Sequence, residues 1–251
     1  MAKRKRSSAS AQGPGLTEER VLAAALAQID RAGLAAFSLR DVARALGVYP
    51  TAVYWYVKGR GELEGRVVAY ALRDIAPPPA TPDWREWLRA LFRRYRTAVQ
   101  RHPNIAPLIG AQLRSNDGMD AELIERVLSV LQAAGFADDA LVDAYNVVIA
   151  ALVGFITQEL AALPDTNPAK WAEAHRKRIS TLDVIAYPVL ARHLWRMANR
   201  AFIVRWSNGV AVPLDSSFEM FVDVVILGLE QRLKAPGGTA AARPRRRRVR
   251  A

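Results

Sequence analysis

Residues 46–60 are the part of the chain that most constrains what it can fold into. Their sequence is LGVYPTAVYWYVKGR. Gly47 accepts a positive φ without steric cost, and Pro50 suits the first turn of a helix, where its missing N–H would be unpaired anyway. The stretch therefore predicts a tight turn followed by a short helix, as in a helix-turn-helix.

The upstream residues predict the two helices that come before this turn. Thr17 is a suitable N-cap, and Gly33 is a suitable left-handed stop. Four residues between them form one apolar face at helical spacing: Leu22, Ala25, Leu26 and Ile29. Ser38 and Asp41 resemble a capping box in which Asp stands where Glu is usual. A second, shorter helix is therefore expected from about residue 39 to residue 46.

The third helix has an unusual outer face. Val53 and Val57 are four residues apart, which predicts that both point inward. Five positions remain for the outside: Thr51, Ala52, Tyr54, Trp55 and Tyr56. Aromatic rings beside a small residue and a hydroxyl suit a surface that meets thymine methyl groups and phosphates. The alternative is a small helical bundle in which these rings serve only as packing.

Residues 16–63 resemble the DNA-binding domain of the tetracycline-repressor (TetR) family, and most closely its tetracycline-repressor branch. The family's Tyr-Trp-His-Val-Lys is matched here by YWYVK at residues 54–58. A weaker resemblance continues at residues 227–234, which look like the end of the last dimerisation helix. The resemblance implies an all-α fold: a three-helix DNA-binding domain followed by a helical domain for dimerisation and effector binding.

The resemblance also implies roles for individual residues. Arg40 stands where an arginine reads guanine, and Pro50 replaces a glutamine that reads a base. Tyr56 and Arg60 take phosphate-binding positions. The expected DNA-binding set is Arg40, Tyr49, Pro50, Thr51, Ala52, Tyr54, Trp55, Tyr56, Lys58 and Arg60. Tyr49 departs from the small or acidic residue that is usual there.

The net charge of +12 lies mostly in two tails. These tails hold ten of the 36 basic residues and no acidic residue. We expect a disordered basic arm at 1–15, a DNA-binding domain at 16–63, an effector and dimerisation domain at 64–234 and a disordered Arg-rich tail at 235–251. The N-terminal arm either contacts DNA or only aids solubility, and solubility is the expectation for the C-terminal tail.

The rest of the chain has helical patterns throughout. The expected helices cover Glu62–Ile75, Asp83–Arg101, Met119–Ala134, Asp138–Leu163, Ile179–Arg205 with a kink or break at Pro188, and Ser217–Lys234. Helices 138–163 and 217–234 are apolar around much of their circumference, which predicts a core on one side and a second subunit on the other. The aromatic residues of the long segment 164–216 either pack as core and lid or line a ligand cavity.

The positions matched to the family's drug-binding residues predict the kind of effector. They are Ala76, Tyr95, Ile109, Gln112 and Val127. No His lies within three positions of Ala76 or Ile109, and no Asp or Glu stands at a matched position, so a magnesium-tetracycline complex is not expected. We expect an apolar or aromatic organic effector bound without metal, oriented by Gln112.

Composition argues against other classes of function. The chain has no Cys, three widely separated His residues and no Gly-rich phosphate loop, so neither an enzyme nor a cofactor is expected. No apolar stretch approaches the ~20 residues of a membrane span, which predicts a cytoplasmic protein without a membrane partner. The expected function is a homodimeric repressor that binds a palindromic operator and is released by an effector. The alternative is an effector-independent architectural DNA-binding protein.

Overall fold

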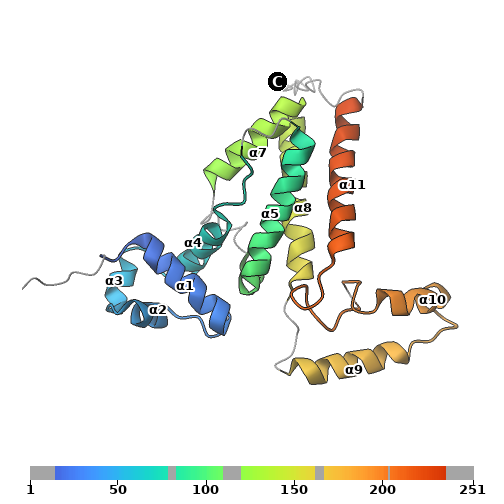
Figure 1. Cartoon of the computed structure of the whole chain (residues 1–251), viewed down its shortest axis with the longest axis horizontal. Coiled ribbons are helices and arrows are strands. Elements are labelled where there is room, and N and C mark those ends of the chain that lie inside the picture. Colours follow the sequence, from blue (N-terminus) through green and yellow to red (C-terminus); the bar gives the residue numbers. More distant parts are fainter. Residues whose placement is uncertain (1–14, 79–82, 110–119, 162–166, 203, 236–251) are drawn as a thin grey trace, which may run out of the picture.

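The computed structural model describes residues 15–78, 83–109, 120–161, 167–202 and 204–235. All regular structure in these stretches is helical, which confirms the predicted all-α class. A small N-terminal head lies beside one end of a body of long helices, and two further helices lie on the other side of that end (Figure 1). Nearly all of the two basic tails lies outside the described residues.

The head has the predicted helix-turn-helix order. It consists of α1 (Glu18–Ala32), α2 (Leu39–Leu46) and α3 (Pro50–Tyr54), and α4 (Arg60–Leu72) leads out of it. Thr17 caps α1 by accepting a hydrogen bond from the N–H of Arg20 at 3.3 Å. Gly47 is left-handed, with φ 69° and ψ 28°, as the turn requires. The signals for helix ends in the sequence are therefore confirmed in this part of the chain.

The capping box at the start of α2 is only half formed. The N–H of Asp41 donates to the Ser38 hydroxyl oxygen at 3.2 Å, as predicted. The carboxylate of Asp41 accepts from the Ser38 hydroxyl at 2.8 Å. This hydrogen bond is the main reason why the pKa of Asp41 is lowered. Asp is one methylene shorter than the Glu of a full capping box, which explains why it bonds to the hydroxyl nearby.

The apolar core of the head is continuous with that of the body. α1, α2 and the short α3 contribute side chains that are buried together, and Leu63 and Val67 of α4 close this core. The buried apolar residues before α4 are Val21, Leu22, Ala25, Leu26, Ile29, Phe37, Leu39, Val42, Ala43, Val53 and Val57. The predicted inward positions of Val53 and Val57 are thus confirmed.

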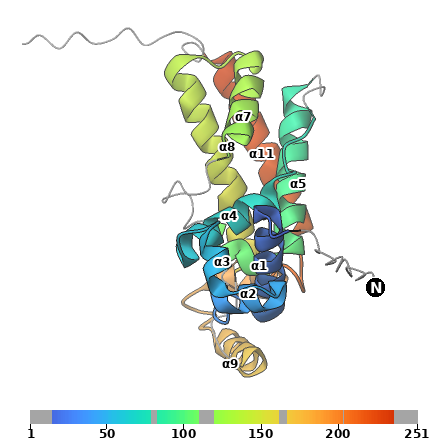
Figure 2. The same ribbon diagram turned by 90° about the vertical axis from the view of Figure 1, so that its left-hand side faces the viewer.

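The body contains α5 (Trp84–Arg101), η1 (Pro103–Ile105), α7 (Ala121–Ala134), α8 (Asp138–Glu159) and α11 (Asp215–Lys234). Where the structure describes them, the ends of α5, α7, α8 and α11 agree with the predicted helices to within a few residues. The predicted ends Met119 and Leu163 lie outside the described residues. Figure 2 shows the head in front of the lower end of this bundle. Since α4 contacts both α1 and α5, it forms the covalent joint between head and body.

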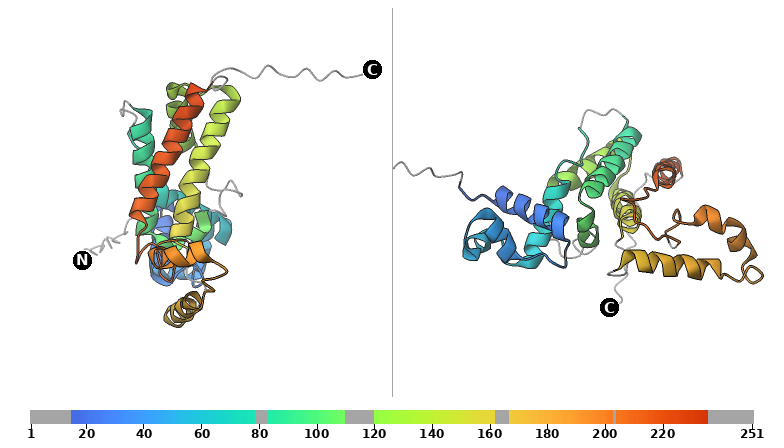
Figure 3. Two further views of the ribbon diagram at one scale, coloured as in Figure 1. Left: turned by 90° about the vertical axis from the view of Figure 1, so that its right-hand side faces the viewer. Right: turned by 60° about the horizontal axis from the view of Figure 1, so that its bottom comes forward.

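A continuous helix over Ile179–Arg205 is wrong, whereas the alternative of a break at Pro188 is confirmed. The chain forms α9 (Pro168–Ser180) and α10 (Pro188–Met197), which we call the side pair. Pro188 does not kink a helix but begins one, at the position where a missing N–H is harmless. The turn before it is held by the carboxylate of Asp183, which accepts from the N–H groups of Ile185 and Ala186. Figure 3 shows the side pair and the head on opposite sides of the body.

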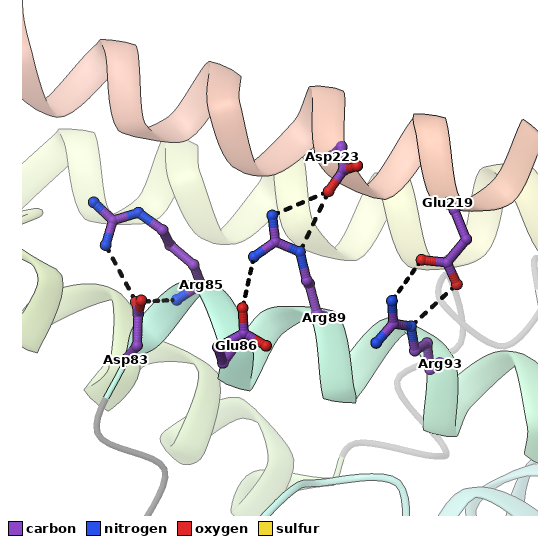
Figure 4. A network of polar contacts seen from close by, with 7 residues as sticks. All are labelled: Asp83, Arg85, Glu86, Arg89, Arg93, Glu219 and Asp223. Carbon is purple, nitrogen blue, oxygen red and sulfur yellow. Dashed lines mark hydrogen bonds and ion pairs between the residues drawn. The ribbon is translucent and has the colours of Figure 1, made fainter.

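A row of ion pairs joins α5 to α11, and it was not predicted from the sequence. Its members are Arg85–Glu230 at 2.9 Å, Arg89–Asp223 at 3.0 Å and Arg93–Glu219 at 2.6 Å. Figure 4 shows how the arginines follow one face of α5 at intervals of four residues. Each pair is partly exposed and stabilises the fold little by itself. Together the pairs define one antiparallel register between the two helices.

The row continues into the protein interior at Arg96. The guanidinium of Arg96 contacts Asp215 of α11 at 2.8 Å and also pairs with Glu159, the last residue of α8, at 2.6 Å. The Glu159 carboxylate accepts a further bond from the N–H of Leu214 at 2.8 Å. The carbonyl of Glu159 accepts from the N–H of Gly209 at 2.7 Å. Three separate segments therefore meet at one buried carboxylate.

The expectation that no segment is long and apolar enough to span a membrane is wrong for α8. α8 is long and apolar enough to cross a bilayer by length and composition alone. It nevertheless packs against α5, α7 and α11. Asp138, Asp139 and Asp143 lie in its first two turns, which is typical of the N-terminal end of a helix in water.

Candidate DNA interface

The outer face of the helix-turn-helix is dominated by exposed rings. Tyr49 is 83% exposed, Tyr54 53% and Trp55 88%. Val53 is completely buried beneath them and fixes which side of α3 points outward. Thr51 is exposed as well, whereas Ala52 is half-buried. Such a surface offers π-faces, methyl groups and hydroxyls, which are the groups that meet base edges and sugar-phosphate chains.

Arg40 lies at the second position of α2, and its side chain is exposed. α2 packs directly against α3, and the contact of Arg40 with DNA stays a prediction. Lys58 is exposed in the loop after α3. Its backbone N–H donates to the Glu62 carboxylate at 2.7 Å, which holds the start of α4 and lowers the pKa of Glu62.

Tyr56 is placed differently from the other rings. It is half-buried rather than outward, and its hydroxyl donates to the carbonyl of Leu16 at 2.7 Å. This bond ties the segment after α3 to the residues that precede α1. The hydroxyl therefore has an internal partner, and the role of Tyr56 in phosphate binding stays a prediction.

Arg60 also has internal partners. Its guanidinium donates to the carbonyls of Leu34 at 2.9 Å and Phe37 at 3.2 Å, and to the Glu64 carboxylate at 2.7 Å. It also lies over the Phe37 ring, 5.6 Å from the centroid. Arg60 thus closes the loop between α1 and α2. Its neighbours in the sequence do not reveal this role, because the carbonyls lie more than twenty residues away.

The candidate effector residues are not brought together in one open site. Tyr95, Ile109 and Val127 are buried in the core of the body. The Tyr95 hydroxyl has no hydrogen-bond partner among the described residues, and its burial raises its pKa. Gln112, which was expected to orient the effector, lies outside the described residues.

Ala76 lines a cleft between the end of α4 and the helices α5 and α7. The cleft has a volume of about 230 Å³ and contains three arginines and three acidic side chains. Arg94 donates to the carbonyl of Asp74, and Arg126 donates to the carbonyl of Pro77, so both arginines hold the segment that follows α4. The surroundings of Ala76 are charged, although the matched positions predicted an apolar or aromatic effector.

Known families match both parts of the chain. A model described as bacterial regulatory proteins of the tetR family matches residues 21–63, and one described as the tetracyclin repressor-like C-terminal domain matches residues 76–233. The chain belongs to the TetR family. The resemblance predicted from residues 54–58 is therefore confirmed, and the match extends through the body and the side pair.

Three relatives show how this TetR-family chain compares with known proteins. The transcriptional repressor DrrR1 of Streptomyces coeruleorubidus is 32% identical over 155 residues, which are 59% of this chain and 55% of DrrR1. A structure of BioQ with its natural double-stranded DNA operator is 32% identical at a TM-score of 0.52, and the match covers 59% of this chain and 89% of BioQ. The chain thus spans about half the length of DrrR1.

The third relative, ActR of Streptomyces coelicolor in complex with actinorhodin, resembles the whole fold. Its TM-score is 0.65 at 22% identity, over 88% of this chain and 100% of ActR. At this identity the likeness shows the fold of the TetR-family chain and nothing more. DrrR1 is named a transcriptional repressor, and the tetR-family model describes bacterial regulatory proteins.

Proposed function

We propose that this TetR-family chain is a homodimeric transcriptional repressor that binds a palindromic operator and is released by a small organic effector. The observation that carries the proposal is the outer face of α3. Exposed aromatic side chains are unfavourable in water, yet Tyr49, Tyr54 and Trp55 stand together on it. DNA in the major groove would cover this face and gain from its methyl, ring and hydroxyl groups. BioQ, the relative in complex with operator DNA, supports the same use of the head.

A second exposed apolar surface supports the homodimer. α8 and α11 pack side by side in the body and turn apolar side chains outward. The exposed residues are Val142 and Val147 of α8 and Met220, Val224 and Leu227 of α11. Two copies of a two-helix face related by a two-fold axis form a four-helix bundle. The predicted dimer helices 138–163 and 217–234 are the ones that carry this surface.

The effector would act from the interior of the body and the cleft beside it. Ile109, Val127 and the ring of Tyr95 offer an apolar environment. The Tyr95 hydroxyl, which has no partner among the residues that the structure describes, and the charged cleft at Ala76 offer hydrogen bonds to such an effector. These groups support an apolar or aromatic effector with a few polar atoms. Imidazole ligands are missing from the matched positions, so we expect no magnesium-tetracycline complex.

The release mechanism would be a shift between two populations. α4 contacts α1 in the head and α5 in the body, so a change at the body end of α4 moves the head. An effector that binds one head arrangement more tightly shifts the equilibrium by that difference in affinity. The repressor would leave the operator when the favoured arrangement no longer matches the half-site spacing.

The test is selection of DNA by the full-length chain from a random pool. The selected sites should be palindromes with a guanine that depends on Arg40. Arg40→Ala should cost about 1–3 kcal/mol per half-site and relax the choice of base at that position. Arg232→Ala, on the exposed face of α11, is the matched control and should bind as the wild type does. Selection of no palindrome by the wild type would refute the proposed function.

A further inference from the structure

In the part of the chain that the structure describes, two main contacts attach the head to the body. One is α4, which is continuous with both parts. The other is the turn after α5, where His102 ends that helix and η1 follows. η1 contacts both α1 and α5. α4 alone would allow the head to rotate about the axis of this helix. The second contact, at the turn after α5, restricts that rotation and therefore has a large influence on the angle of the head.

The second attachment is made of directed polar contacts. The Asn104 side-chain amide donates to the carbonyls of Ile29 at 2.9 Å and Asp30 at 3.1 Å. His102 Nδ1 lies 2.7 Å from Asp30 Oδ2. The Ile29 carbonyl also accepts from the N–H of Gly33 at 2.8 Å, whereas the carbonyls after it have no partner in the next turn of the helix. The body therefore supplies additional hydrogen-bond donors to the end of the head's first helix.

This contact is anchored firmly on the body side. Ile105 is completely buried, and Ala106 is almost so. Pro103 fixes its own φ within the turn. The amide of Asn104 is therefore presented from a rigid support, and its two bonds fix both the position and the direction of the end of α1.

We propose that Asn104, assisted by His102, is a positioning residue that sets the angle of the head on the body. In a two-fold dimer this angle determines the separation of the two recognition helices, and hence the spacing of half-sites that the protein accepts. The statement about DNA spacing rests on the proposed function. The statement about the angle of the head rests on the contacts of Asn104 and His102 alone.

The first test measures the angle without DNA. The chain has no cysteine, so Ala45→Cys in α2 and Gln132→Cys in α7, both at exposed positions outside the proposed dimer face, provide two spin labels. An excess of unlabelled chain restricts the measured distances to one subunit. We expect one narrow distance distribution for the parent chain. Asn104→Asp places a carboxylate against the two carbonyls and should broaden or shift the distribution.

Two further variants keep this test decisive. Asn104→Ala removes the donors without adding charge and should broaden the distribution less. Asn208→Asp, in the loop beside Glu159, keeps the oxygen that accepts from the Val210 N–H and should leave the distribution unchanged. A distribution for Asn104→Asp that equals that of the parent chain would overturn the proposal.

The second test measures the spacing preference on DNA. The selected palindrome is synthesised with its half-sites moved apart or together by one and two base pairs, and an isolated half-site is included. Asn104→Asp should reduce the preference for the best spacing by about tenfold, the size expected for one or two lost hydrogen bonds. Its affinity for the isolated half-site should equal that of the wild type, because the reading surface is intact.

A purely structural role of Asn104 would give a different result. It would weaken the half-site and every palindrome by the same factor, and this outcome would overturn the proposal. If the wild type selects no palindrome, the proposed function fails, while the label distances still decide whether Asn104 sets the angle of the head.

Discussion

Arg96 of α5 and Glu159 of α8 form a two-bond ion pair inside the body. Nε of Arg96 lies 2.9 Å from Oε2, and Nη2 lies 2.6 Å from Oε1. Glu159 is completely buried. A buried carboxylate is tolerated only when its oxygens are paired and hydrogen-bonded. Here the Arg96 guanidinium donates to both oxygens, and the Leu214 N–H donates to one of them.

Removing the arginine should therefore destabilise the fold strongly. Arg96→Met leaves a buried charge without its partner, and we expect the free energy of unfolding to fall by about 3–5 kcal/mol. Arg93→Met removes an exposed pair on the same helix and should cost at most about 1 kcal/mol. Urea denaturation at a fixed subunit concentration measures both. Equal losses for the two variants would contradict the assignment of the buried pair.

The α5–α11 ion pairs should make stability depend on pH in the acid range. Hydrogen bonds from Arg93 and Arg85 hold the pKa values of Glu219 and Glu230 below the ordinary value of 4.5. A carboxylate with a lowered folded pKa stabilises the fold above its ordinary pKa, and this contribution is lost as the pH falls through the folded pKa.

The doubly substituted Glu219→Gln/Glu230→Gln chain should therefore show a smaller fall in Tm than the wild type between neutral and strongly acid pH. Glu173→Gln, on the exposed face of α9, is the control and should follow the wild-type curve. Thermal melts at a series of pH values give the comparison. Parallel curves for the double variant and the wild type would disprove the contribution of these pairs.

Stability and DNA binding should separate at two neighbouring residues of α3 and its C-cap. Trp55→Ala changes an exposed ring and should alter the free energy of unfolding by less than about 0.5 kcal/mol, while the affinity for the selected operator falls. Val53→Ala empties part of the head core and should cost about 1–3 kcal/mol. Denaturation and fluorescence anisotropy with labelled DNA provide the two measurements. Unchanged operator affinity of Trp55→Ala would remove this ring from the interface.

The two faces of α11 should respond differently to a charge. Val224→Arg and Leu227→Arg lie on the exposed face and should give a folded monomer, because the charge opposes association of two apolar surfaces. Leu229→Arg lies in the core of the same chain and should unfold the body. Sedimentation and circular dichroism distinguish these results. A stable dimer of Leu227→Arg would show that α11 does not form the proposed interface.

Much of the head could be predicted because its signals are local. Thr17, Gly47 and Pro50 act through their own backbone or through N–H groups within three residues, so their positions in the sequence reveal their roles. The inward direction of Val53 follows from helical periodicity. Short-range chemistry of this kind does not depend on how the rest of the chain folds.

The contacts that were not predicted from the sequence connect segments that are distant along the chain. Tyr56 bonds to Leu16, and Arg60 bonds to Leu34, across loops that no local pattern describes. The arginines of α5 do carry a signal, since their spacing of four residues places them on one face of a helix. Pro188 was ambiguous for a physical reason: proline both interrupts a helix and starts one, and only the fold decides between the two.

The chain leaves the body for the side pair after Glu159, and the segment that follows the side pair is hydrogen-bonded to the same residue. The carbonyl and the carboxylate of Glu159 hold the N–H groups of Gly209 and Leu214, on the far side of residues 160–208. Glu159 thus holds the two ends of segment 160–208 together, while the ion pairs between α5 and α11 maintain the register of these two helices. Insertions or deletions between the clamped ends would change the reach of the side pair without shifting a single turn of the bundle.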